Sequence, residues 1–187
     1  MRLLLLMLFL SLSLFGKSIV TKNSEIFIDT IKVGTVYKGA FLTKKSDMYV
    51  ASGWVMDGNE YILFYNNEER IKLLKIEETS INRYEVIETK KDAYDVTWKH
   101  VRLNFHIKTA ENILENTTEN IWAHEEELYL RCGSCHKAHT PEEYTINQWP
   151  NVLKTMSDRA GFSPEEVTEV GNYLQYKALN YSIGGTK

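Results

Sequence analysis

The chain has 187 residues, of which 43% are hydrophobic and 12% aromatic, and its formal net charge is −3. This composition is typical of a folded protein and excludes an intrinsically disordered chain. The mild acidity gives no support to nucleic-acid binding, which needs a basic surface. The length allows one domain or two small ones.

The N-terminus has the pattern of a secretory signal. Arg2 gives a short positive region, and the run from Leu3 to Phe15 is apolar except for two serines. Gly16-Lys17-Ser18 then has the small-x-small spacing of a signal-peptidase site. A helix of this run rises about 20 Å, less than the ~30 Å of a bilayer core. We expect residues 1–18 to be a cleaved signal peptide and the protein to be periplasmic without an integral anchor, although an uncleaved, tilted anchor stays open.

Residues 19–112 have the pattern of a β-rich domain. Short runs of alternating apolar and polar residues are separated by turn residues, and such runs predict antiparallel strands. Asp57-Gly58 indicates a hairpin and Asn66-Asn67 a second turn. The alternation changes phase between Trp98 and Val101, which we interpret as a β-bulge.

Two short motifs indicate the kind of β-fold. Gly34-Thr35-Val36 and Gly53-Trp54-Val55 resemble segments of bacterial SH3-like domains. We therefore predict a small antiparallel barrel of the SH3-like type for this part of the chain.

Near Ala110 the periodicity becomes helical. Thr117-Thr118-Glu119 indicates the start of a helix that runs on to Cys132. Residues 140–143 and 163–166 each have the pattern of a capping box with a proline in the first turn. Both boxes therefore predict helix starts.

Between the two capping boxes lies an amphipathic stretch. Trp149, Val152, Leu153 and Met156 share one face of a helix that ends before Gly161. The predicted fold class is thus α+β. It combines a signal peptide (1–18), a β-rich, SH3-like barrel domain (19–112) and a small all-helical domain (113–187).

The two cysteines of the chain lie in the motif Cys132-Gly133-Ser134-Cys135-His136. Two thiols three residues apart on a helical turn lie on the same side, and a histidine follows at once. This spacing is that of covalent haem attachment in c-type cytochromes. We expect one haem c, held by Cys132 and Cys135, with His136 as an iron ligand.

Other uses of this motif are less favoured. A structural zinc site needs four ligands and rarely has a histidine directly after C-x-x-C. A thioredoxin-like redox pair is expected in a βαβ context, which the pattern around Cys132 does not have.

A helical domain of this size has little hydrophobic core of its own. It commonly needs an additional stabilising element, such as disulfides or a bound metal. We predict that the haem supplies this core and that the haem-free form is poorly ordered. The residues expected around the haem are Trp149, Val152, Leu153, Phe162, Val170 and Leu174.

The second iron ligand is predicted to be Met156, because it shares the apolar face of its helix with Trp149. A thioether opposite the histidine raises the reduction potential relative to two histidines. His139 is the main rival. An open position, His124, or a strand histidine (His100 or His106) stays open as well.

A longer set of residues, within 95–178, resembles a known family. Besides the motif and Arg131, the set comprises Ile121-Trp122, Leu128-Tyr129, Pro141, Tyr144-Thr145, Gln148-Trp149-Pro150, Leu153, Met156 and Tyr173-Leu174. It resembles the C-terminal monohaem domain of TorC-type cytochromes, which feed electrons to periplasmic molybdopterin reductases of trimethylamine N-oxide and related S- or N-oxides. TorC-type proteins also carry a membrane-anchored tetrahaem module with four further C-x-x-C-H sites, whereas this sequence has one such site.

The resemblance implies an electron carrier and not an enzyme. The expected acceptor is a molybdopterin-dependent N-oxide or S-oxide reductase of anaerobic respiration, and the expected donor is a quinol dehydrogenase or another cytochrome. By the same resemblance, Cys132, Cys135 and His136 hold the haem, and Met156 matches a ligand position. The alternatives are a haem-dependent regulatory or interaction protein, and a haem sensor or peroxidase with an open iron position.

Overall fold

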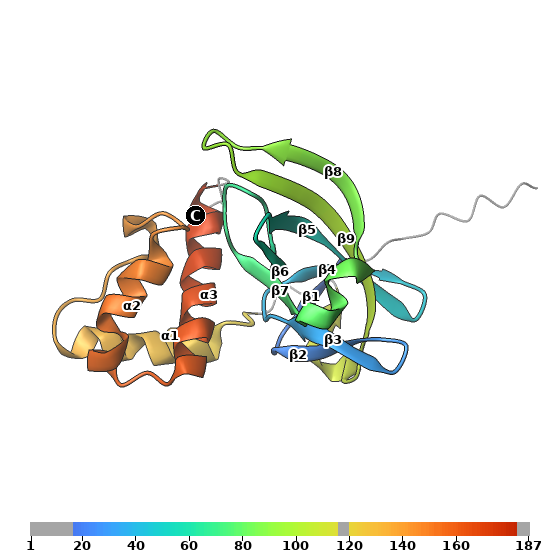
Figure 1. The fold of residues 1–187 in the computed structure, drawn as a ribbon. Coiled ribbons are helices and arrows are strands. Elements are labelled where there is room, and N and C mark those ends of the chain that lie inside the picture. Colours follow the sequence, from blue (N-terminus) through green and yellow to red (C-terminus); the bar gives the residue numbers. More distant parts are fainter. Residues whose placement is uncertain (1–16, 116–119, 183–187) are drawn as a thin grey trace, which may run out of the picture.

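The computed structural model describes residues 17–115 and 120–182, which form a β-rich part and a smaller helical part beside it (Figure 1). The predicted signal peptide lies outside these ranges except for Lys17 and Ser18, which begin strand β1 (Lys17–Val20). Within the described ranges, no helix is both long and apolar enough to cross a membrane.

Six antiparallel strands close into a barrel, in the order β5-β6-β7-β3-β2-β9 and back to β5. Closure depends on β9, which pairs with β5 along most of its length and with β2 at its C-terminal end. The six strands are β2 (Ser24–Ile28), β3 (Ile31–Val36), β5 (Met48–Met56), β6 (Asn59–Phe64), β7 (Lys72–Ile76) and β9 (Thr97–Ile107).

Four further strands extend the barrel into a ten-stranded sheet. β4 (Phe41–Lys45) pairs with the start of β5, β1 pairs with β4, and β10 (Ile113–Glu115) pairs with β1. β8 (Glu85–Lys91) pairs with β9, and together they form a long curved ribbon (Figure 1). Two short 3-10 helices, Glu78–Arg83 and Ala110–Asn112, complete the β-rich part.

Alternate side chains of the strands fill the barrel. Val101, Leu103 and Phe105 of β9 are at most 1% exposed and share one apolar cluster with Ala51 and Val55 of β5. Because successive strand residues point to opposite faces, this inward set accounts for the alternating pattern of β9.

The predicted fold class is wrong in its type of barrel and in the extent of the sheet. The sequence predicts an α+β fold with an SH3-like barrel and then an all-helical domain. Over the residues that the structure describes, it instead has a closed six-stranded barrel within a ten-stranded sheet, followed by a small region with three α-helices. The sheet is larger than predicted because β9 is long: its eleven residues pair with β5, β2 and β8. β10 begins at residue 113, where the helical domain was expected to start.

The phase change in β9 also has a different cause from the predicted bulge. β9 pairs with β5 without a register shift from Trp98 to Phe105. Trp98 lies on the outer face, where it is fully buried in a second cluster with Ile62 and Phe64. The apolar pattern therefore changes face because β9 serves two cores, one inside the barrel and one outside it.

The helical part consists of α1 (Ala123–Tyr129), α2 (Trp149–Ala160) and α3 (Pro164–Ser182), with 3-10 turns at Leu130–Ser134 and Pro141–Glu143. Both predicted capping boxes form. The box at residues 140–143 begins only the 3-10 turn, whereas the box at residues 163–166 begins α3. α2 ends, as predicted, at the left-handed residue Gly161. The helix start predicted at 117–119 lies outside the described residues.

α3 lies between α2 and the barrel (Figure 1). Ile71, next to β7, belongs to the apolar cluster of the helical part and is fully buried there. Gly39, at a φ of 87°, approaches the helices so closely that a Cβ there would lie 2.6 Å from the rings of Trp122 and Tyr176. The two parts thus share one packed interface.

A buried ion pair crosses this interface. Lys38 Nζ lies 2.7 Å from both carboxylate oxygens of Glu125 in α1 and 5.4 Å from the Trp122 ring centre. The Glu125 side chain is 2% exposed and that of Lys38 is 13% exposed. Because an unpaired charge at such a position is costly, the pair ties the start of α1 to the barrel.

We predict that Glu125→Ala destabilises the protein by about 3 kcal/mol, because it leaves the Lys38 ammonium poorly solvated and unpaired. The double variant Lys38→Met/Glu125→Leu should recover most of this loss. Arg102→Ala, which breaks an exposed pair with Glu85, is the control and should cost at most about 1 kcal/mol. Urea unfolding measures all three, and equal costs for the two single variants would contradict the argument.

Candidate functional site

The cysteine motif lies where α1 tightens into a 3-10 turn. Tyr129 and Leu128, at the end of α1, are buried in the core of the helical part, and Cys132 follows them into it with 8% exposure. Cys135 and His136 lie just beyond the turn and are exposed. The turn therefore presents one cysteine at the core and the other at the surface.

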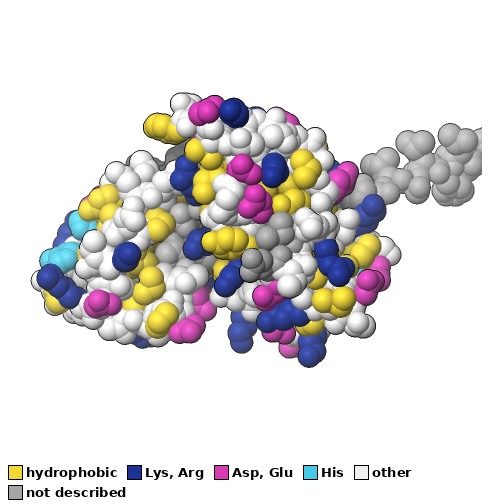
Figure 2. Space-filling view, in the orientation of Figure 1, with side chains coloured by type: hydrophobic (Ala, Val, Ile, Leu, Met, Phe, Trp, Pro, Cys, Tyr) yellow, Lys and Arg dark blue, Asp and Glu magenta, His cyan; other side chains and the backbone are white. Residues whose placement is uncertain are grey.

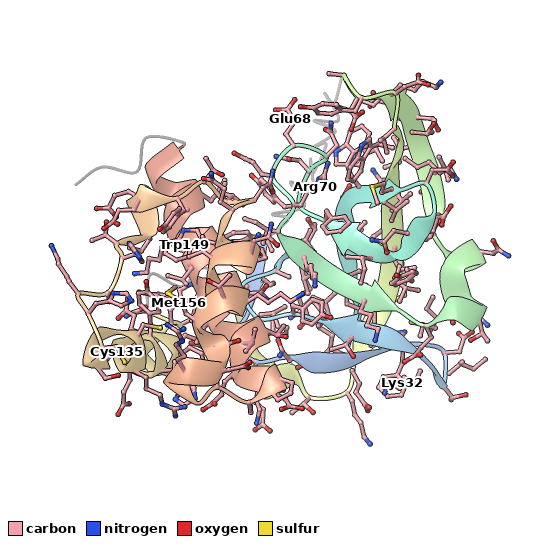
Figure 3. The ribbon with its side chains drawn as sticks, turned by 60° about the vertical axis from the view of Figure 1, so that its left-hand side comes forward. Lys32, Glu68, Arg70, Cys135, Trp149 and Met156 are labelled. Atoms are coloured by element: carbon pink, nitrogen blue, oxygen red, sulfur yellow. The ribbon has the colours of Figure 1, made fainter. Side chains whose placement is uncertain are left out.

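A cavity of about 100 Å³ opens beside this turn. Cys132, Cys135 and His136 belong to its lining, together with Met156 of α2. Figure 3 shows Cys135 and Met156 on the side of the helical part that lies away from the barrel. The four residues singled out from the sequence thus lie around one cavity, which Arg131, Ser134, Arg159 and Ala160 complete.

Burial affects the two thiols differently. The apolar surroundings of Cys132 raise the pKa of its thiol above the ordinary value, because burial disfavours the charged thiolate. Cys135 has no comparable shielding, since its side chain is exposed.

The imidazole ring of His136 lies against the backbone of the next residue in the chain. Its Nδ1 lies 2.8 Å from the carbonyl oxygen of Lys137. When Nδ1 donates to this oxygen, the ring adopts the tautomer whose Nε2 carries the free lone pair. A hydrogen bond from the other ring nitrogen to a carbonyl oxygen is the usual way in which proteins orient a histidine ligand.

The rival histidine, His139, has other partners. Its Nδ1 lies 2.7 Å from a carboxylate oxygen of Glu143, and its ring packs edge-on against Tyr144. The backbone N–H of Thr140 and the His139 ring hold the pKa of Glu143 below its usual value. His139 does not line the cavity.

The remaining histidines also lie off the cavity. His100 stacks on Trp54 and bonds to Ser52, and His106 lies 3.2 Å from the carbonyl oxygen of Asp47. Both belong to β9 of the barrel. His124 lies at the start of α1 and is exposed. Figure 2 shows histidine side chains on the surface at the far end of the helical part from the barrel.

The apolar residues expected around a haem have another role. Trp149, Leu153, Val170 and Leu174 are at most 1% exposed, in a cluster that includes Ile71 of the barrel part. None of the four lines the cavity. The barrel therefore contributes to the core that the sequence assigns to the haem.

The donor set around the cavity fits a covalently held haem. Two thiols and an imidazole meet there, as c-type attachment requires, and a thioether beside them can serve as a second iron ligand. The cavity is smaller than the ~300–1,000 Å³ of typical ligand pockets. The segment between the motif and α2, residues 137–148, contains only one 3-10 turn of regular structure.

Sequence reasoning assigned no role at the site to the two arginines of the cavity, Arg131 and Arg159, although Arg131 was among the residues of the family resemblance. A signal for Arg159 was present, because it lies three residues after Met156 and hence on the same side of α2. Arg131 adjoins Cys132 in the sequence.

Comparison with known proteins finds two relatives among c-type cytochromes. Cytochrome c-type protein TorY of Haemophilus influenzae is 29% identical over 127 residues, covering 67% of this chain and 34% of that protein. Cytochrome c-type protein TorY of Escherichia coli O157:H7 is 28% identical over 170 residues, covering 85% of this chain and 46% of that protein. The chain thus spans a third to a half of the length of these relatives. It matches no protein-family model and no solved structure.

These findings confirm the resemblance to c-type cytochromes, although both relatives carry the name TorY and not TorC. The comparisons also extend the range of residues over which the resemblance holds. An alignment that covers 85% of the chain cannot be confined to residues 95–178 and must include much of the barrel.

We predict that, in the haem-free protein, iodoacetamide alkylates Cys135 faster than Cys132 at neutral pH. The variants Cys132→Ser and Cys135→Ser isolate the two thiols. The rate at Cys132 should continue to rise with pH beyond the range of an ordinary cysteine, because the reactive thiolate forms only above its raised pKa. Identical rates and pH profiles for the two variants would refute the assigned burial.

Proposed function

We propose that the protein is a periplasmic monohaem c-type cytochrome that carries single electrons and is not an enzyme. The observation that carries this proposal is the meeting of Cys132, Cys135, His136 and Met156 around one cavity. The similarity to two c-type cytochromes supports it. We further propose that residues 1–18 direct export and that residues 113–187 carry the haem, next to the β-rich residues 19–112.

Each of the four residues has a distinct task in this proposal. Cys132 and Cys135 hold the haem through thioether bonds, and His136 supplies an imidazole nitrogen whose tautomer the Lys137 carbonyl sets. Met156 supplies a soft sulfur ligand from α2, at a half-buried position. A bound haem supplies a one-electron couple at its iron, and a methionine ligand gives that couple a higher potential than a second histidine.

We propose a molybdopterin-dependent reductase of trimethylamine N-oxide, or of a related N- or S-oxide, as the electron acceptor. The TorC-type resemblance of residues 95–178 and the TorY names of the relatives support this partner. A quinol dehydrogenase or another cytochrome is the proposed donor.

A second candidate function is a haem-dependent interaction protein, and one contact favours it. Asn147, in the loop between the motif and α2, donates from Nδ2 to the carbonyl of Glu68 (2.6 Å) and accepts from the backbone N–H of Arg70 (3.0 Å). Glu68 and Arg70 lie on the barrel side of this contact (Figure 3). A conformational change in this loop on haem binding would thus be transmitted to the barrel part through the Asn147 hydrogen bonds. Equal binding of haem-free and haem-loaded protein to a candidate sensor would remove this function.

We predict that Met156→Ala abolishes the weak near-infrared iron–sulfur band of the ferric protein and lowers its midpoint potential, because the soft ligand is lost. Met48→Ala, a change in β5 of the barrel, is the control and should leave both unchanged. A high-spin ferric spectrum of the wild-type protein would contradict Met156 ligation and favour an open iron position.

The proposed respiratory role is tested by deleting the gene and measuring anaerobic growth. We expect growth with trimethylamine N-oxide or an S-oxide as terminal acceptor to be lost and to return with the wild-type gene. A Cys132→Ala/Cys135→Ala gene should not restore it. Normal growth of the deletion strain on both kinds of acceptor would contradict the proposed partner.

A further inference from the structure

A second cavity, of about 140 Å³, lies where the barrel meets the helices. We call it the junction cavity. Its lining comes from the segment that enters β7, from the start of α2 and from α3, and it shares no residue with the cavity beside the cysteine motif. A cavity of about 150 Å³ holds a molecule the size of benzene. The junction cavity therefore has room for a small ligand, and its use does not depend on haem attachment.

The junction cavity has a positively charged side. Arg70 and Lys72 both line it, and none of its lining residues is Asp or Glu. The Arg70 guanidinium lies 5.4 Å from the ring centre of Trp98 and acts electrostatically on Asp92, contacts that hold it on the barrel side of the junction (Figure 3). Lys72 is exposed, and its ammonium has no partner within residues 17–115 and 120–182. The cavity thus opens to solvent beside a free positive charge.

A buried amide of α3 belongs to the same lining. Asn172 is 5% exposed, and its side chain has no hydrogen-bond partner among the residues that the structure describes. Its amide atoms are not completely enclosed, so a molecule in the cavity can contact them. Gln175, further along α3, is by contrast bonded, because its Nε2 donates to the carbonyl oxygen of Ile146 at 3.0 Å. Since an unpaired buried amide costs free energy, Asn172 needs a partner from within the cavity.

Much of the remaining lining is apolar. Pro150 and Leu153 come from α2, and Val167 comes from α3. The hydroxyl of Thr168 is already used, because it donates to the carbonyl oxygen of Pro164. A phosphate ion has polar oxygens on every side and would leave some of them unpaired against these apolar groups. A carboxylate on a short hydrocarbon stem can instead direct its two oxygens to the donors and pack its stem against the apolar residues.

We propose that the junction cavity binds a short aliphatic carboxylate of about the size of butyrate. Lys72 and Arg70 supply the positive charge that the carboxylate needs, and Asn172 supplies an amide N–H donor. The bound acid lies between the barrel and α3, so its binding energy adds to the contact between the two parts.

The test uses the full chain and sodium butyrate, with sodium phosphate and sodium chloride at the same ionic strength for comparison. The readouts are the side-chain amide resonance of Asn172 in ¹H–¹⁵N NMR spectra and the dissociation constant from the titration. Lys72→Met removes the free charge at an exposed position, and Asn172→Asp replaces the donor with a repelling carboxylate. Lys75→Met is the matched control, because Lys75 is exposed on the same strand and does not line the cavity.

We expect butyrate to shift the Asn172 resonance in a saturable manner. Lys72→Met should weaken binding at least about fivefold, since an ionic partner is lost, and Asn172→Asp should abolish it. Lys75→Met should bind like the wild-type protein. The absence of a saturable shift, or equal weakening by Lys72→Met and Lys75→Met, would overturn the site. An equal response to phosphate would overturn its assignment to a carboxylate.

Discussion

The structure depends on a series of buried aromatic side chains in the core of the helical part. The rings of Trp122, Tyr173 and Tyr129 follow one another at centre distances of 6.1 and 6.3 Å, and Trp149 continues the series at 6.2 Å from Tyr129. Aromatic contacts of this kind add to the gain from buried apolar area. Because Ile71 closes the same cluster, the helical part relies on the barrel for a complete core.

This shared core determines where the cysteine motif lies. The burial of Tyr129 fixes the end of α1, and the 3-10 turn that follows takes Cys132 to the edge of the core and Cys135 into solvent. Met156 comes from the outer helix, α2, whose inner face is anchored by Trp149. The ligating side chains thus come from two elements whose inner residues share one core, and the side of the cavity away from that core is open to solvent.

Local signals were sufficient to predict much of this arrangement. The αL glycine at the end of α2, the hairpin at Asp57-Gly58 and the capping box before α3 each depend on a few neighbouring residues. The C-x-x-C-H spacing likewise brings Cys132, Cys135 and His136 together without any tertiary contact. What the sequence could not provide was long-range pairing. The closure of β9 onto β2 and the entry of Ile71 into the helical core depend on residues far apart in the chain.

The central claim is that Cys132 and Cys135 covalently hold one haem, and intact-mass spectrometry tests it most directly. The protein is produced with the periplasmic haem-attachment machinery and extracted with acidified acetone, which removes haem that is not covalently bound. The account predicts the polypeptide mass plus one haem after extraction, with a pyridine haemochrome spectrum of the c type. The mass of the bare polypeptide would contradict it.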